Sequence, residues 1–187
     1  MRKGDSKNVE FHNVSLTDIP YESQFDVIFS NSVLHCVKEI QKALRALYKA
    51  LKPSGYLAVQ FPLLNPAHPL VCFANQAIDS LKLQRAFETW EFPWYTTTEE
   101  DFKTLMTDMG FYHVEVVKKE SCFQFHSVSE AYTFFDAVGL KLYLDELPRE
   151  KTALFISEFN RNIEALWTGE SVKLKFERIF ALGAKNK

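Results

Sequence analysis

Polar side chains gather at the end of one apolar segment. The apolar run over residues 25–30 ends in Ser30, and Asn31, Ser32 and His35 follow it. The run is rich in β-forming residues, which predicts a strand buried on both faces. In open α/β sheets, ligands bind beyond the carboxyl ends of the strands. We therefore expect these polar side chains to face a ligand crevice.

His35 is the candidate catalytic residue, because it ends this polar loop. The alternative is structural, with the His35 ring packing at the start of the next helix. The other histidines, which show no metal-ligand spacing and predict no metal site, are expected at surface or half-buried positions; they are His12, His68, His113 and His126.

Aromatic residues over positions 88–96 form a second candidate group. Trp90, Trp94 and Tyr95 lie in an expected loop that follows another predicted strand, so they could cover a substrate in the same crevice. The alternative is ordinary packing of a loop that carries Pro93. The sequence favours neither interpretation.

The elements that position these residues follow from periodicity. Apolar residues spaced by four, three and four over 40–51 predict a helix from Lys38 to Leu51. Pro53 and Gly55 end it, and residues 56–61 predict a second strand. A helical connection of this length implies two parallel strands with a right-handed crossover.

The remaining elements alternate in type, which predicts an α/β fold with a mostly parallel sheet. The last strand is expected to be antiparallel, at or near an edge. The expected elements are a short strand at Val9–Phe11, a helix after Pro69, a helix opened by a Thr97–Glu100 capping box and stopped by Gly110, a strand from Tyr112 to Val116, a helix opened by Ser127 and Glu130 that ends before Gly139, a helix over 151–167 and a strand over 172–182.

Composition narrows the class of protein. The 187 residues suffice for one domain, and a formal net charge of −2 gives no sign of a nucleic-acid partner. No apolar run approaches the roughly 18 residues of a membrane-spanning helix. Cys36, Cys72 and Cys122 are expected to be buried or half-buried thiols in a reducing cytoplasm. We therefore expect a cytoplasmic protein with no membrane partner.

Three sequence blocks carry a resemblance to a known family. Residues 8–20, then F-D-x-I-x-S-N-x-x-L-H over 25–35, then L-K-P-x-G at the start of 51–61, resemble class I S-adenosylmethionine (SAM)-dependent methyltransferases. The chain is similar to the small-molecule branch that includes trans-aconitate and malonyl-carrier-protein methyltransferases. The resemblance implies a Rossmann-like, three-layer α/β/α fold. It implies a single partial domain, 1–187, with core motifs in 8–62, a lid or helical region in 63–110, and C-terminal strands and helices in 111–187.

The resemblance also implies a cofactor and a reaction. SAM would lie with its methionine half beside Ser30, Asn31 and Ser32, and with its adenine near the Ser15 hydroxyl and the Leu16 N–H. A hydroxyl at Ser15 would bind adenine less well than the carboxylate usual in the family. The implied acceptor is a small molecule, methylated on oxygen and expected to be a carboxylate, which needs positioning more than a base.

Glycine is scarce, and this departs from the family. The six glycines lie too far apart to form a loop that cradles a nucleotide cofactor. The family's first two strands, with their SAM-binding segment, would precede residue 1, so the resemblance implies an N-terminally truncated chain with an incomplete SAM site. Two alternatives are a catalytically inactive, methyltransferase-like binding or regulatory protein and a domain that binds some other ligand in the remaining crevice.

The same departure bears on assembly. In the family's sheet order, the strand over 25–30 would lose its inner neighbour and become an apolar sheet edge. We therefore expect either a homo-oligomer formed through this edge or an edge covered by a helix.

Overall fold

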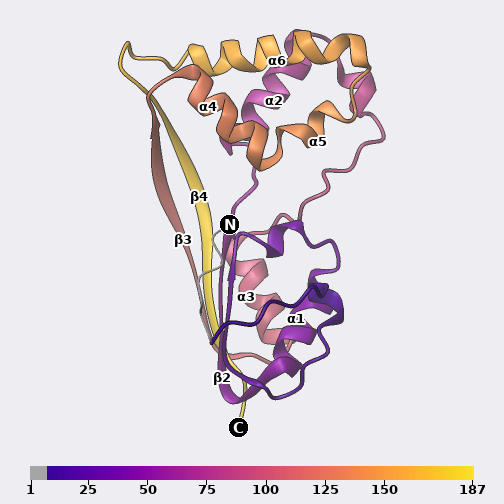
Figure 1. Cartoon of the computed structure of the whole chain (residues 1–187), viewed down its shortest axis with the longest axis vertical. Helices are drawn as coiled ribbons and strands as arrows, with labels where there is room; N and C mark the ends of the chain where they lie inside the picture. Colours follow the sequence, from indigo (N-terminus) through magenta and orange to yellow (C-terminus); the bar gives the residue numbers. More distant parts are fainter. Residues whose placement is uncertain (1–7) are drawn as a thin grey trace.

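A mixed sheet of four strands organises the computed structural model, which describes residues 8–187 (Figure 1). The strand order is β1-β2-β4-β3, with β1 and β2 parallel and β4 antiparallel to both of its neighbours. The strands are β1 (Phe25–Asn31), β2 (Leu51–Pro62), β3 (Tyr112–Phe125) and β4 (Val172–Ala184).

The strand–helix–strand unit predicted from residues 25–61 is confirmed. Helix α1 (Ile40–Ala50) connects β1 to β2, which pair in parallel with Ile28 opposite Leu57 and Ser30 opposite Val59. Leu57 and Val59 are buried against α1 and α3. On the opposite face Phe29 is 69% exposed, so the prediction that β1 is buried on both faces was wrong.

Two further predictions about the sheet were wrong. The sheet is not mostly parallel, because β4 lies between β2 and β3 and runs antiparallel to each. Residues Val9–Phe11 form no strand, since they pair with no strand among residues 8–187, and Phe11 is 94% exposed. The expectation for β4 is confirmed, because it is antiparallel and adjacent to the edge strand β3.

The helices form two groups. Helices α1 and α3 cover one face of the sheet and complete the part that we call the body, whereas α2, α4, α5 and α6 gather beyond its upper end in Figure 1, and we call these the lid helices. The lid helices therefore come from both the 63–110 and the 111–187 regions. Their bounds are α2 (Pro69–Ser80), α3 (Glu99–Asp108), α4 (Val128–Phe135), α5 (Lys141–Leu144) and α6 (Arg149–Glu164), with a wide turn at Asp136–Leu140 and short 3-10 turns at Leu16–Asp18, Leu34–Cys36 and Gln84–Phe87.

Capping residues define two of these helices. The Ser127 hydroxyl accepts the Glu130 N–H at 3.0 Å, which confirms the predicted capping box of α4. For α3 the prediction was wrong by one residue. Thr98, not Thr97, is the N-cap, and its hydroxyl accepts the Asp101 N–H at 3.1 Å.

Two hydrophobic clusters hold the fold together, one in the body and one under the lid helices. The lid cluster is unusually aromatic, with Phe73, Phe135 and Phe159 meeting edge to face at 5.4 to 5.8 Å. Strand β4 belongs to both clusters, because Phe176 packs in the lid cluster and Ile179 in the body cluster. The last strand of the chain therefore joins the two parts.

The α/β class and the Rossmann-like arrangement are confirmed, but the helices lie on one side of the strands (Figure 1). The second helical layer of the expected three-layer fold does not lie among residues 8–187. The opposite sheet face there carries exposed apolar side chains, which include Val27, Phe29, Tyr56, Val117 and Leu182. As predicted, β1 is an edge strand.

The structure also tests the expectations for the cysteines, for membrane-spanning helices and for metal sites. Cys36 and Cys122 are exposed, which corrects the expectation of burial, and Cys72 is half-buried. All three thiols are free. Within residues 8–187, no helix has the length and apolar character that crossing a membrane requires, and no cluster of metal-ligating side chains occurs.

Candidate functional site

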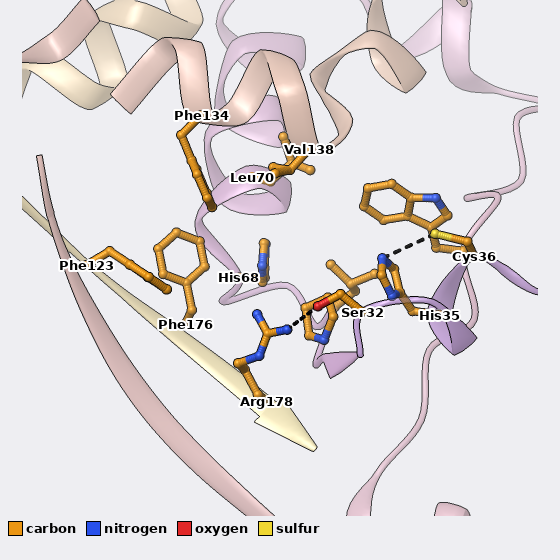
Figure 2. Close-up of a pocket in the computed structure, with 13 residues that line it drawn as sticks. Ser32, His35, Cys36, His68, Leu70, Phe123, Phe134, Val138, Phe176 and Arg178 are labelled. Atoms are coloured by element: carbon orange, nitrogen blue, oxygen red, sulfur yellow. Dashed lines mark hydrogen bonds between the residues drawn. The ribbon is translucent and has the colours of Figure 1, made fainter. Parts of the chain in front are cut away.

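A cavity of about 380 Å³ lies where the lid helices meet the carboxyl ends of β1 and β2, and we call it the lid cavity (Figure 2). Its volume is at the lower end of the range of small-molecule sites. It is lined by Ser32, His35, Cys36, Pro62, Leu64, His68, Leu70, Trp94, Phe123, Phe134, Val138, Phe176 and Arg178.

Arg178 supplies the only charged side chain in this lining. It projects from β4 toward the loop after β1, where its Nε donates to Gln60 Oε1 and its Nη2 donates to Ser32 Oγ (Figure 2). Burial lowers the pKa of Arg178, but a guanidinium remains cationic at neutral pH. Among residues 8–187 no carboxylate pairs with this cation. A half-buried cation with only neutral partners favours an anionic ligand.

His35 and His68 are the other titratable groups that are deeply buried beside the cavity, each 7% exposed. Burial, reinforced by the charge of Arg178, lowers the pKa of each to about 4, so both rings are neutral at pH 7. The Nδ1 atom of each ring is buried and has no hydrogen-bond partner in the described chain. The expectation that His68 is at the surface or half-buried was therefore wrong.

His35 packs in the fold, as the structural alternative predicts, and it also lines the cavity, while a catalytic role stays a prediction. It lies in the 3-10 turn Leu34–Cys36 ahead of α1, and its ring packs edge to face on Trp94 at 5.1 Å. Its Nε2 is 3.4 Å from Cys36 Sγ, and its carbonyl accepts the Tyr95 N–H at 2.7 Å. It therefore joins the loop after β1 to the aromatic loop while also lining the cavity.

The far wall of the cavity is apolar. Phe176 of β4 lies 5.1 Å from Phe123 of β3 and 5.5 Å from Phe134 of α4, measured between ring centroids. Leu70 and Val138 extend this wall along the lid helices (Figure 2). The cavity is thus polar at the sheet end and apolar beneath the lid helices.

The structure brings only some of the predicted site residues to the cavity. Ser32, His35 and Trp94 line it. Trp90 instead packs on Tyr143 at 5.0 Å in the lid cluster, and Tyr95 packs against Phe102 in the body.

The predicted cofactor residues lie in two places. Ser30 is buried on the α1 face of β1, while Asn31 and Ser32 are exposed at its end. Ser15 lies apart from the cavity lining, and its hydroxyl accepts the Thr17 N–H at 3.3 Å and so caps the 3-10 turn that contains Leu16. That hydroxyl already has a role in the fold.

Sequence reasoning missed Arg178 and His68. A signal for Arg178 existed, because Val172, Leu174 and Phe176 are the apolar residues of an alternating strand and Arg178 continues their phase. A lone arginine in the apolar phase of a strand indicates a charge directed toward a buried region. No local pattern marks His68, whose burial depends on Phe176, more than a hundred residues later, at 5.3 Å.

Comparisons with known proteins agree with this architecture. A family profile described as "Methyltransferase domain" matches residues 1–59. Trans-aconitate 2-methyltransferase of Variovorax paradoxus is 25% identical over 181 residues, covering 89% of this chain and 65% of that protein. Malonyl-[acyl-carrier protein] O-methyltransferase of Calditerrivibrio nitroreducens is 38% identical over 48 residues, covering 26% and 20%. The solved structure of loganic acid methyltransferase with SAH covers 92% of this chain and 65% of its own, at 9% identity and a TM-score of 0.60.

Fold and sequence together define the class of protein. The methyltransferase domain match over residues 1–59, the relatives and the fold together support a class I SAM-dependent methyltransferase. It spans less than two thirds of the length of the first two relatives named above.

The lid cavity itself fits SAM poorly, because SAM carries a sulfonium cation and the cavity already holds the Arg178 guanidinium. The exposed, neutral side chains of Asn31 and Ser32 at the end of β1 fit the polar methionine half better. The lid cavity therefore suits an anionic ligand with an apolar part better than it suits the SAM sulfonium.

Proposed function

We propose that this chain supports the transfer of a methyl group from SAM to a carboxylate oxygen of a small molecule bound in the lid cavity. The observation that carries the proposal is Arg178, a half-buried cation without a carboxylate partner among residues 8–187, hydrogen-bonded to the loop after β1. The printed names of two relatives, an aconitate methyltransferase and an O-methyltransferase, support the same acceptor chemistry.

When bound, SAM supplies an electrophilic methyl group. Transfer to a carboxylate oxygen would exchange the methyl–sulfur bond for an O–C bond without a proton leaving the acceptor, so the site would need no base. Arg178 would hold the carboxylate, while Ser32 and Gln60 hold Arg178 in place. Alignment is then the main contribution of the protein, and neutral His35 would line the site without acting as a base.

Calorimetry with SAM tests the cofactor half of the proposal. A dissociation constant tighter than about 100 μM, or roughly −5.5 kcal/mol, would show useful binding by this chain. We expect Asn31→Ala to weaken it and Asn186→Ala, an exposed asparagine near the C-terminus, to leave it unchanged. Transfer of a labelled methyl group to a panel of carboxylic acids tests the other half.

A second candidate function is that of a binding or regulatory protein without catalysis. Its support is the scatter of the six glycines, which leaves no loop that could cradle SAM within these 187 residues. This alternative predicts that small carboxylates bind the lid cavity while SAM does not bind. Measurable methyl transfer by the chain would exclude it.

A further inference from the structure

We propose that the lid cavity selects an acceptor with a single carboxylate and one apolar body. The carboxylate binds Arg178 at the sheet end, and the apolar body lies beneath the lid helices. The methylation of this acceptor rests on the proposed function, but its binding can be measured separately.

The charge of the lining sets the number of carboxylates. Arg178 is the only charged residue there, and His35 and His68 are neutral at pH 7. One carboxylate would therefore be matched by one cation. A second or third carboxylate on the ligand would be taken out of water without a counter-ion, which is costly.

The geometry of Arg178 leaves a donor for this carboxylate. Its Nε and Nη2 are held by Gln60 and Ser32, whereas Nη1 has no hydrogen-bond partner among residues 8–187. Figure 2 places the guanidinium between Ser32 and the ring of His68.

The apolar wall sets the nature of the rest of the acceptor. Leu70, Phe123, Phe134, Val138 and Phe176 surround the cavity beyond His68 (Figure 2). They offer no hydrogen-bonding side chain, so hydroxyls or amides on this part of a ligand would lose their water without compensation. Alkyl or aryl groups gain by leaving water there.

Titration calorimetry of the full chain with four probes tests the inference. Octanoate and 3-phenylpropionate have one carboxylate and an apolar body, octanamide has the body without the charge, and citrate has several charges without the body. We expect both monocarboxylates to bind at least about tenfold more tightly than octanamide. This difference is the effect of one charge-assisted hydrogen bond. Citrate should bind no better than octanamide.

Two variants locate the binding. Arg178→Gln should weaken octanoate about tenfold and leave octanamide unchanged, whereas Lys173→Gln removes an exposed charge from the same strand and should change neither. If Arg178→Gln does not fold, Val138→Trp provides a second test. Val138 is 40% exposed, so a larger side chain should be tolerated there and should block octanoate and octanamide alike.

The outcomes separate this inference from the proposed function. Equal affinity for octanoate and octanamide, or tighter binding of citrate, would overturn the inference. Methylation of citrate but not of octanoate would overturn it as well, while leaving the methyl transfer proposal intact. Selective octanoate binding without any SAM binding or methyl transfer would instead refute the proposed function alone.

Discussion

The indole of Trp94 lies directly against Gly139. A β-carbon at Gly139 would come within 2.2 Å of Trp94 Cη2 and 3.1 Å of Leu70 Cδ2. Both of these neighbours line the lid cavity. The turn between α4 and α5 therefore approaches the cavity wall as closely as a residue without a side chain allows.

Gly139→Ala should disturb the lid cavity through this contact. The added methyl group must displace the Trp94 ring or the turn, so we expect a lower melting temperature and weaker octanoate binding. Thermal unfolding and calorimetry measure the two effects. Gly169→Ala is the matched control. Its φ of +91° makes any side chain strained, but nothing lies within 4 Å, so it should lower stability without changing ligand affinity.

The free energy of unfolding should decrease as the pH is lowered, because of His35 and His68. Their pKa is about 4 in the folded protein against 6.5 as the ordinary value, so the unfolded chain binds protons more readily between these values. The stabilisation is complete above pH 6.5 and is lost as the pH falls toward 4. Each histidine contributes up to about 3 kcal/mol to this loss.

Urea unfolding at pH 7.5 and pH 5 measures this dependence. His68→Leu removes one of the two groups, so the difference in unfolding free energy between the two pH values should shrink. His126→Leu replaces an exposed histidine and should keep the wild-type difference. An unchanged difference in His68→Leu would contradict the assignment.

The aromatic lid cluster should account for a large share of the stability. Phe135 is fully buried and contacts both Phe73 and Phe159 edge to face. Phe135→Ala should lower the unfolding free energy by about 3–5 kcal/mol, because it leaves a cavity among these rings. Leu154→Ala, on a side chain that is 52% exposed, should change it by less than about 0.5 kcal/mol. Guanidinium unfolding compares the two variants.

Self-association through the β1 edge stays a prediction. Val27 and Phe29 are 60% and 69% exposed on this edge strand, which favours burial against another copy. Phe29→Lys should shift the chain toward a monomer in light scattering across a concentration series. Lys38→Ala, a change of an exposed lysine outside this strand, serves as the control. A monomeric wild type at all concentrations would refute the prediction.

The sequence predicted the local elements well. The β1–α1–β2 unit, the Ser127 cap and the amphipathic pattern of α6 depend on residues close together in the chain, where periodicity and capping are informative. The predictions failed where distant segments decide the outcome. Placing β4 between β2 and β3 makes most of the pairings antiparallel, and no local pattern in residues 172–184 states which strands flank it.

The site shows the same division. Ser32 and His35 could be found because they follow a recognisable strand, but Arg178 reaches Ser32 from 146 residues further along the chain. Trp94 lines the cavity, whereas Trp90 packs on Tyr143 within the lid cluster and Tyr95 packs against Phe102 in the body. In the sequence, nothing distinguishes these three aromatic residues as candidates for the cavity.

The position of β4 also has a consequence for biosynthesis. This strand leaves the ribosome after every other element of residues 8–187, yet it supplies Phe176 to the lid cluster and Ile179 to the body cluster, and it separates two strands made earlier. Before it emerges, β2 and β3 have unpaired edges that could join to each other or to a neighbouring nascent chain. The growing polypeptide is therefore exposed to misassembly between these edges until β4 is translated.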